Sequence, residues 1–258
     1  MMTASCVFSC IGLHAVGLAN AGIETRAFCE INPWRRAEIA KTFPAAEMIH
    51  DDAWTYFPPH TDIIVGGPPC QNTSVASAIH GRRSGQSLWP AMRRICSGRK
   101  WVVVEQPPGH AQWEAAVSRD LAEDGFHVGR FEFSASDVGA PYLRRRVFLV
   151  ASTCLSGLQG AWEALPSAID QVARSAIARG DWCPDQLAAG AVDARAAGEL
   201  DRGAKSRWRR ELIGALGDSN PPRMMEALGR AIVTGSVESG MLSSSGEGPV
   251  VVSEASDT

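Results

Sequence analysis

The sequence has no apolar stretch of the roughly 20 residues that a membrane-spanning helix needs. No basic residue precedes Arg26, so the charged start of a secretory signal peptide is missing as well. The seven cysteines include no Cys-x-x-Cys pair, which argues against a disulfide framework and against a zinc ribbon. We therefore expect a cytoplasmic protein with free thiols, without a membrane segment and without a bound metal.

A strong positive charge is also missing, because the net charge is −3. Residues 231–258 hold four acidic and no basic residues, so removing their −4 from −3 leaves +1 on residues 1–230. The basic residues cluster instead, in segments 82–100 and 205–210. Such clusters either contact phosphates or form a solvated face.

What is present is enough apolar sequence for one α/β core, since 45% of the 258 residues are hydrophobic. Alternating apolar runs and helical periodicities predict a doubly wound sheet. Strands are expected near 5–9, 26–30, 62–66, 101–105, 129–134 and 147–151. Helices are expected near 13–21, 34–42, 87–97, 111–124 and 222–233.

One cysteine stands on a loop whose backbone is closely restricted. Cys70 follows two glycines and two prolines, directly after the apolar run that ends at Val65. Proline fixes φ and glycine permits close approach, so the sequence specifies this loop more tightly than packing requires. Cys70 is therefore a candidate nucleophile, and the alternative is a buried cysteine that acts as a small hydrophobe.

Two other strand ends carry charged side chains. Glu105 ends the apolar run that starts at Trp101, and Arg144 and Arg146 lead into the run 147–151. Ligands of open α/β sheets bind outside the carboxyl ends of the strands, so Cys70 and Glu105 are expected at one rim. Taken singly, the carboxylate could be an ordinary ion-pair partner and the arginines an exposed strand entry.

Together, these motifs resemble those of the DNA cytosine-5 methyltransferases, in order and in approximate separation. The family's Pro-Cys-Gln loop matches residues 69–71, its Glu-Asn-Val element matches residues 105–107, and its Gln-x-Arg-x-Arg element matches residues 142–146. The resemblance implies an α/β, Rossmann-like S-adenosylmethionine-dependent methyltransferase fold with a doubly wound mixed sheet. It also implies S-adenosyl-L-methionine as the cofactor and DNA as the partner.

Other segments resemble the family's cofactor site, with departures. Residues 8–17 match the methyl-donor loop, but Cys6 replaces the usual Asp, and Cys10 and Leu13 replace two glycines. Residues 216–222 match the closing Gly-Asn-Ser-Val loop, with Asp218 in place of Asn. Glu30 falls where the family binds ribose, and Asp51 where it binds the adenine amine. The cofactor contacts that the resemblance implies are Phe8, Ile11, Gly12, Glu30, Ile31, Asp51, Pro68, Asp218 and Ser219.

The resemblance also divides the chain. Residues 1–151 would form the catalytic and cofactor-binding domain, 152–210 a short target-recognition segment, and 211–233 the closing loop and helix, while 234–258 should form a disordered tail. The family's recognition region is irregular and β-rich, whereas residues 168–177 look helical. Trp162, Trp182 or Trp208 could lie near bases or pack as partial core residues.

The chemistry implied by the resemblance is covalent. The Cys70 thiolate would add to carbon 6 of a flipped cytosine, while Glu105 acts on the ring and Arg144 and Arg146 stabilise base and carboxylate. The leading interpretation is a compact, monomeric DNA cytosine-5 methyltransferase of the kind found in restriction–modification or mobile elements. Two alternatives stay open, which are a degenerate non-catalytic DNA-binding relative and an RNA cytosine-5 methyltransferase.

Overall fold

A seven-stranded mixed sheet forms the centre of the molecule. The computed structural model describes residues 1–69, 88–179, 211–212, 214–216 and 218–242. The strands are β1 (Thr3–Val7), β2 (Glu24–Cys29), β3 (Met48–His50), β4 (Ile63–Gly66), β5 (Trp101–Gln106), β6 (His127–Ser134) and β7 (Arg145–Ser152). Their order in the sheet is β3-β2-β1-β4-β5-β7-β6, and β7 runs antiparallel to both of its neighbours. The predicted doubly wound mixed sheet is confirmed.

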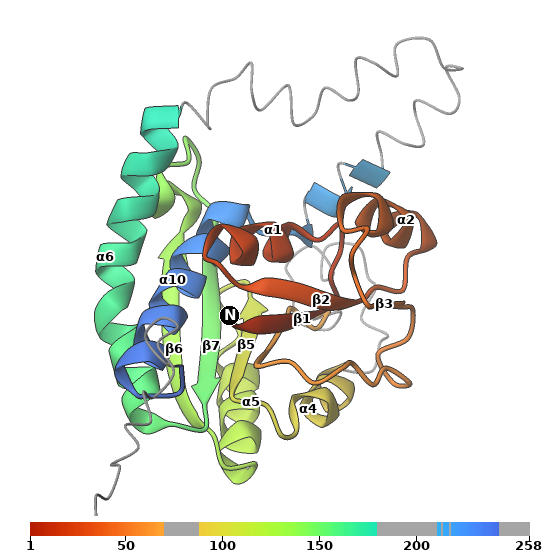
Figure 1. Ribbon diagram of the computed structural model, residues 1–258, viewed down its shortest axis with the longest axis horizontal. Helices are drawn as coiled ribbons and strands as arrows, with labels where there is room; N and C mark the ends of the chain where they lie inside the picture. Colours follow the sequence, from red (N-terminus) through yellow and green to blue (C-terminus); the bar gives the residue numbers. More distant parts are fainter. Residues whose placement is uncertain (70–87, 180–210, 213, 217, 243–258) are drawn as a thin grey trace, which may run out of the picture.

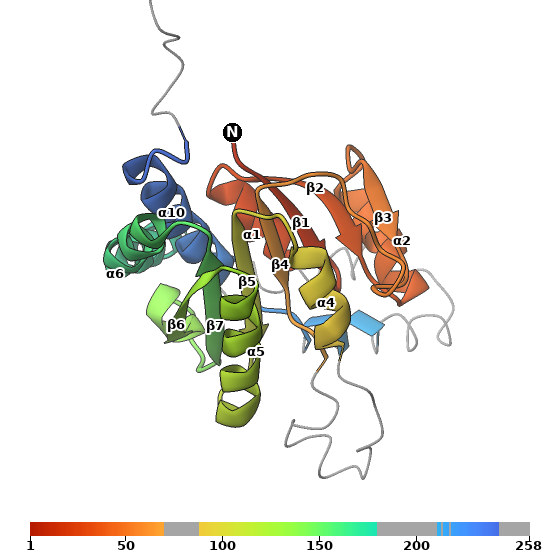
Figure 2. The same ribbon diagram turned by 90° about the horizontal axis from the view of Figure 1, so that it is seen from below.

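Helices cover both faces of the sheet (Figures 1 and 2). They are α1 (Leu13–Asn20), α2 (Pro33–Thr42), α4 (Trp89–Cys96), α5 (Ala111–Glu123), α6 (Leu155–Arg179) and α10 (Pro222–Glu238), with a 3-10 turn at Ala135–Val138. Side chains alternate along β5, so Trp101 and Val103 join the core under α1, α6 and α10, while Val102 and Val104 join the core under α4 and α5. None of the described helices has the length and apolarity needed to cross a membrane.

All six predicted strands and all five predicted helices are present, with ends shifted by a few residues. The sequence pattern missed β3, which has only three residues and therefore shows no alternation. It also predicted only part of α6, which runs for 25 residues and packs lengthwise against α10. Part of segment 152–210 therefore belongs to the packed core, and residues 180–210 lie outside the described residues.

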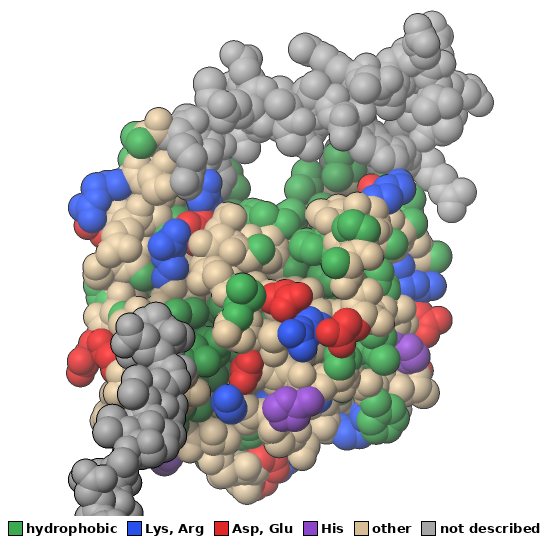
Figure 3. Space-filling model, viewed as in Figure 1, with side chains coloured by type: hydrophobic (Ala, Val, Ile, Leu, Met, Phe, Trp, Pro, Cys, Tyr) green, Lys and Arg blue, Asp and Glu red, His purple; other side chains and the backbone are tan. Residues whose placement is uncertain are grey.

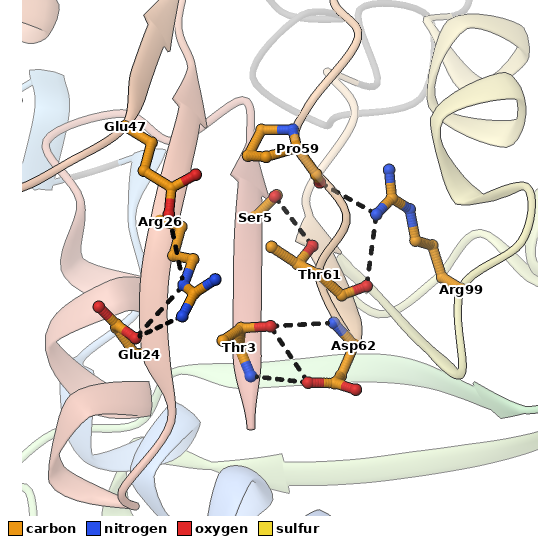
Figure 4. Close-up of polar contacts among 9 residues, drawn as sticks. All are labelled: Thr3, Ser5, Glu24, Arg26, Glu47, Pro59, Thr61, Asp62 and Arg99. Atoms are coloured by element: carbon orange, nitrogen blue, oxygen red, sulfur yellow. Dashed lines mark hydrogen bonds and ion pairs between the residues drawn. The ribbon is translucent and has the colours of Figure 1, made fainter. Parts of the chain in front are cut away.

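Basic residues near the amino-terminal ends of the parallel strands form hydrogen bonds and ion pairs within the protein. Figure 4 shows Arg99 donating to the carbonyl of Pro59 at this end. Arg94 donates to three carbonyls between residues 53 and 56, and Lys100 lies 2.9 Å from a carboxylate before β4. Arg93, on α4, pairs with carboxylates at the end of α5 and directly after it. These four cations join neighbouring segments of the protein, so the described part of cluster 82–100 has a structural role. Figure 3 shows acidic and basic side chains interspersed on the face in view.

Candidate active site

The strand register forms a row of side chains at the carboxyl ends of the parallel strands. In the pairing ladder Val7 is level with Cys29 and Gly66, Cys29 with His50, and Gly66 with Val104. The residues that follow this row are Phe8, Glu30, Asp51, Gly67 and Glu105. The predicted cofactor-binding residues Phe8, Glu30 and Asp51 and the predicted catalytic residue Glu105 therefore lie along a single rim.

Glu105 is the buried carboxylate of this rim, with 7% of its surface exposed. Its Oε1 lies 2.7 Å from Nε of Arg146. Burial raises the pKa of Glu105 above its ordinary value, and the charges of Arg146 and Arg144 and a hydrogen bond from Asn220 oppose that rise. A raised pKa favours the protonated carboxyl group, which can deliver a proton to a neighbouring base.

Arg144 and Arg146 reach the site because side chains alternate along β7. Both lie on the same side as Phe148, whose ring is buried under α6 and α10, whereas Arg145 points to the other side and pairs with Glu132. Nη2 of Arg144 donates to the carbonyl of Ser219 at 2.7 Å. The structure thus brings together three predicted groups, the carboxylate and two arginines, and ties them to the closing loop.

The loop that leads to Cys70 is fastened to the end of β5. Nε2 of Gln106 donates to the carbonyl of Pro68 at 2.8 Å, and both groups are buried. A Cβ atom on Gly67 would lie 2.7 Å from Oε2 of Glu105, so only glycine allows the carboxylate this position. Cys70 itself lies outside the described residues.

On the opposite half of the rim, Glu30 organises the turn that follows β1. Its carboxylate accepts the backbone N–H of Cys10 at 2.8 Å and that of Asn32 at 2.9 Å, with 6% of the residue exposed. Phe8 and Cys10 have φ values of 56° and 53°, a left-handed backbone conformation that residues other than glycine adopt at a cost of about 1–2 kcal/mol. The cysteine that replaces a family glycine therefore keeps a glycine-like backbone.

Residues 2–155 match the family model described as C-5 cytosine-specific DNA methylase, which is more than half of the chain. This chain belongs to that family. Members of the C-5 methylase family use S-adenosylmethionine as the methyl donor.

Curated relatives agree with this membership, and a solved structure shares the fold. The type II methyltransferase M2.BsuMI of Bacillus subtilis is 29% identical over 158 residues, which are 57% of this chain and 41% of the relative. M.NgoPII of Neisseria gonorrhoeae is 30% identical over 156 residues, 56% of this chain and 46% of the relative. The chain thus spans less than half the length of these relatives. A Spodoptera frugiperda DNMT2 mutant has the same fold, with a TM-score of 0.51 and 20% identity over 60% of this chain and 51% of that chain.

The donor half of the rim fits the cofactor of this C-5 methylase family. Glu30 uses two of about four lone-pair sites on backbone N–H groups, which leaves acceptors for ribose hydroxyls. Ile31 beside it is 79% exposed and offers an apolar surface for a purine, and the Asp51 carboxylate is accessible. A side chain on Gly12 would meet the ring of Phe43 at 2.6 Å, so glycine is required there.

The two predicted cofactor contacts of the closing loop, Asp218 and Ser219, have different surroundings. Oδ2 of Asp218 lies 2.6 Å from Nη2 of Arg35 on α2, so this carboxylate is directed to an arginine. Ser219 is buried beside Cys10, whose Sγ contacts the carbonyl of Ala215 at 3.2 Å. The sulfur thus fills space between the donor loop and the closing loop.

Sequence reasoning missed two buried residues of the site, His14 and Asn220. Nε2 of His14 lies 3.4 Å from Nδ2 of Asn220, and the side chain of Asn220 also hydrogen-bonds to Glu105. No local pattern marks either residue, because their contact depends on how α1 packs against the start of α10. Both loops and the rim enclose a cavity of about 20 Å³, room for one water molecule. Among the described residues, no group of three or more His, Cys, Asp or Glu could hold a metal ion.

Proposed function

We propose that this chain methylates carbon 5 of cytosine in DNA through a covalent adduct on Cys70. The observation that carries the proposal is the buried Glu105 carboxyl, which has a raised pKa, an arginine at 2.7 Å, and a place at the end of the strand next to the Cys70 loop. S-adenosylmethionine, when bound, supplies an electrophilic methyl group. Membership of the family supports the same reaction.

Glu105 acts on the pyrimidine ring. Addition of the Cys70 thiolate to carbon 6 pushes an electron pair towards ring nitrogen 3, and a protonated Glu105 offers its proton there. Arg146 then pairs with the carboxylate that is left behind, in the geometry already present at 2.7 Å. Arg144 donates a hydrogen bond to the Ser219 carbonyl and so holds the closing loop beside the site.

The remaining steps return the base to aromaticity. Carbon 5 takes the methyl group with the enamine electron pair as the bond between the methyl group and the donor sulfur breaks, and it then loses its own proton to water. The sulfur of Cys70 leaves carbon 6 with its bonding electrons, and the proton on ring nitrogen 3 returns to Glu105. The cytosine must be flipped out of the duplex first, because neither face of carbon 6 is accessible in stacked DNA, at a cost of a few kcal/mol. Cys70, Glu105 and the two arginines are thus the proposed catalytic residues.

The cofactor contacts and the domain division are part of the same proposal. Glu30 would hold the ribose hydroxyls and Asp51 the adenine amine, with Phe8, Ile11, Gly12, Ile31, Pro68, Asp218 and Ser219 around them. Segment 152–210 would contact the target, with α6 as its anchor on the sheet. We further propose a monomer that acts in the cytoplasm.

Incubation with labelled S-adenosylmethionine and matched DNA and RNA substrates tests the proposal. We expect label on carbon 5 of DNA cytosine and none with Cys70→Ser. Label found only in RNA would favour the RNA enzyme, and label on adenine or on an exocyclic nitrogen would overturn the chemistry. Cofactor and DNA binding without any transfer would favour the non-catalytic relative.

A further inference from the structure

Three polar side chains from distant parts of the sequence meet behind the candidate active site. Glu105 ends β5, His14 lies in the first turn of α1, and Asn220 precedes α10. Their exposed fractions are 7%, 7% and 1%. Asn220 lies between the other two, hydrogen-bonded to the Glu105 carboxylate and 3.4 Å from Nε2 of His14.

The chemistry of these groups fixes the orientation of the amide. When Glu105 is ionised its carboxylate only accepts hydrogen bonds, so the amide then turns its NH2 group towards Glu105. The second hydrogen of that NH2 group needs another acceptor, and Nε2 of His14 provides it when the imidazole is neutral and carries its proton on Nδ1. Oδ1 of Asn220 is buried without a hydrogen-bond partner among the described residues. Because an unpaired buried acceptor is costly, the two donated bonds must hold the amide in place.

The surrounding charges favour the neutral histidine. Burial and the positive charge of Arg146 lower the pKa of His14 to about 4, so the imidazole is neutral at neutral pH, and in its Nδ1–H tautomer Nε2 is the acceptor. The charged groups that face Glu105 are Arg146 and Arg144, both from the β7 hairpin. Protonating His14 would add a third positive charge and remove the acceptor that Asn220 uses.

We propose that His14 and Asn220 are positioning residues for Glu105. Neutral His14 fixes the amide of Asn220, and the amide fixes the carboxyl group against Arg146 and tunes its proton affinity. This inference rests on the proposed function only in that Glu105 acts on the base. The pair does not touch the reacting atoms, and it acts through the carboxyl group.

The titration of Glu105 tests the pair without any substrate. The protein is labelled with [carboxyl-13C]glutamate, the Glu105 resonance is assigned with Glu105→Gln, and its pH midpoint is measured by NMR. Asn220→Leu removes the amide donor that lowers the pKa, and Asn220→Ser replaces it with a shorter side chain whose hydroxyl does not span the same distance, so both should move the midpoint upward. His14→Leu should also raise it, whereas His14→Gln keeps an acceptor and should restore it.

His127→Gln is the matched control, because His127 is an exposed histidine at the first position of β6. It should leave the Glu105 midpoint unchanged. Circular dichroism melts identify any variant that does not fold. Asn220→Ser and His14→Gln are included because they keep a polar group at each site and are therefore the variants expected to fold. An unmoved midpoint in folded Asn220→Ser would overturn the inference.

Methyl transfer separates this inference from the proposed function. We expect His14→Leu and Asn220→Ser to lower kcat about tenfold with little change in KM, and His14→Gln to recover most of the loss. If the wild-type protein transfers no methyl group but the midpoint shifts as stated, the proposed function fails and the positioning pair stands. If transfer is normal in all variants and the midpoint is constant, the pair is refuted and the proposed function stands.

Discussion

Gly67→Ala places one methyl group against the carboxylate of Glu105. The new Cβ would lie 2.7 Å from Oε2, and ordinary contact begins at 3.4 Å, so one of the two groups must retreat by about 0.7 Å. The backbone of Gly67 does not have a positive φ, so alanine itself introduces no strain there. The carboxylate is held by Arg146 at 2.7 Å and by Asn220, so its displacement breaks contacts on its far side.

The expected cost appears in the rate of the chemical step. A misplacement of 1 Å can cost a hundredfold, so a shift of about 0.7 Å should lower kcat by roughly ten- to hundredfold. Single-turnover methylation with saturating cofactor measures this rate, and thermal melts check the fold. Gly214→Ala is the control, because its Cβ would meet only Arg35 at 3.9 Å. A Gly67→Ala rate within twofold of wild type would refute the placement of Glu105 in the reaction.

Three further predictions concern pH, the cofactor and the Cys70 loop. The pKa of His14 is depressed from 6.5 to about 4, so as the pH falls the unfolded chain binds a proton that the folded protein does not. The free energy of unfolding should therefore decrease by about 3 kcal/mol as the pH drops from 6.5 to 4. Chemical denaturation at each pH measures this decrease, and His14→Gln should make it smaller. Glu30→Ala should weaken S-adenosylmethionine binding at least tenfold, because a hydrogen bond to a charged group contributes about 1.5–3 kcal/mol, and unchanged calorimetric affinity would remove Glu30 from the site. Gln106→Leu should slow adduct formation roughly fivefold by freeing the Pro68 carbonyl, and an unchanged rate would show that the loop is held by other contacts.

The sequence predicted the fold well because the information is local. Continuous apolar runs mark β5 and β7, and glycines and prolines mark the turns between them. The rim position of Glu105 follows from the end of its run, and the shared side of Arg144 and Arg146 follows from the alternation of side chains along a strand. The three-residue strand β3 was missed because so short an edge strand is specified by its neighbour β2.

The contacts between distant segments could not be predicted in this way. His14 and Asn220 are 206 positions apart, and their meeting depends on the close packing of α1 on α10, where a Cβ on Gly17 would lie 2.2 Å from the carbonyl of Pro222. The same holds for the pairing of Arg35 with Asp218. The motif at residues 216–222 resembles the family's closing loop, but which side chains it brings to the rim depends on contacts between distant segments.

Most of the other described cysteines are too weakly ionised to compete with Cys70 in the central test. Burial raises the pKa of Cys6 and Cys29 to about 12 and raises that of Cys96 as well, so these thiols form almost no thiolate at neutral pH. Cys154 is more exposed, and hydrogen bonds led by that from Ser156 lower its pKa. A Cys154→Ser background therefore removes the most reactive of the described competitors.

The most direct measurement of the central claim is covalent trapping on DNA that contains 5-fluorocytosine. Fluorine cannot leave carbon 5 as a cation, so elimination is blocked after methyl transfer and the protein stays attached to the base. We expect mass mapping to find one adduct, on Cys70, which disappears in Cys70→Ser and forms more slowly in Glu105→Gln. Recovery of the base on Cys29, Cys96 or another cysteine, or trapping that survives Cys70→Ser, would contradict the account.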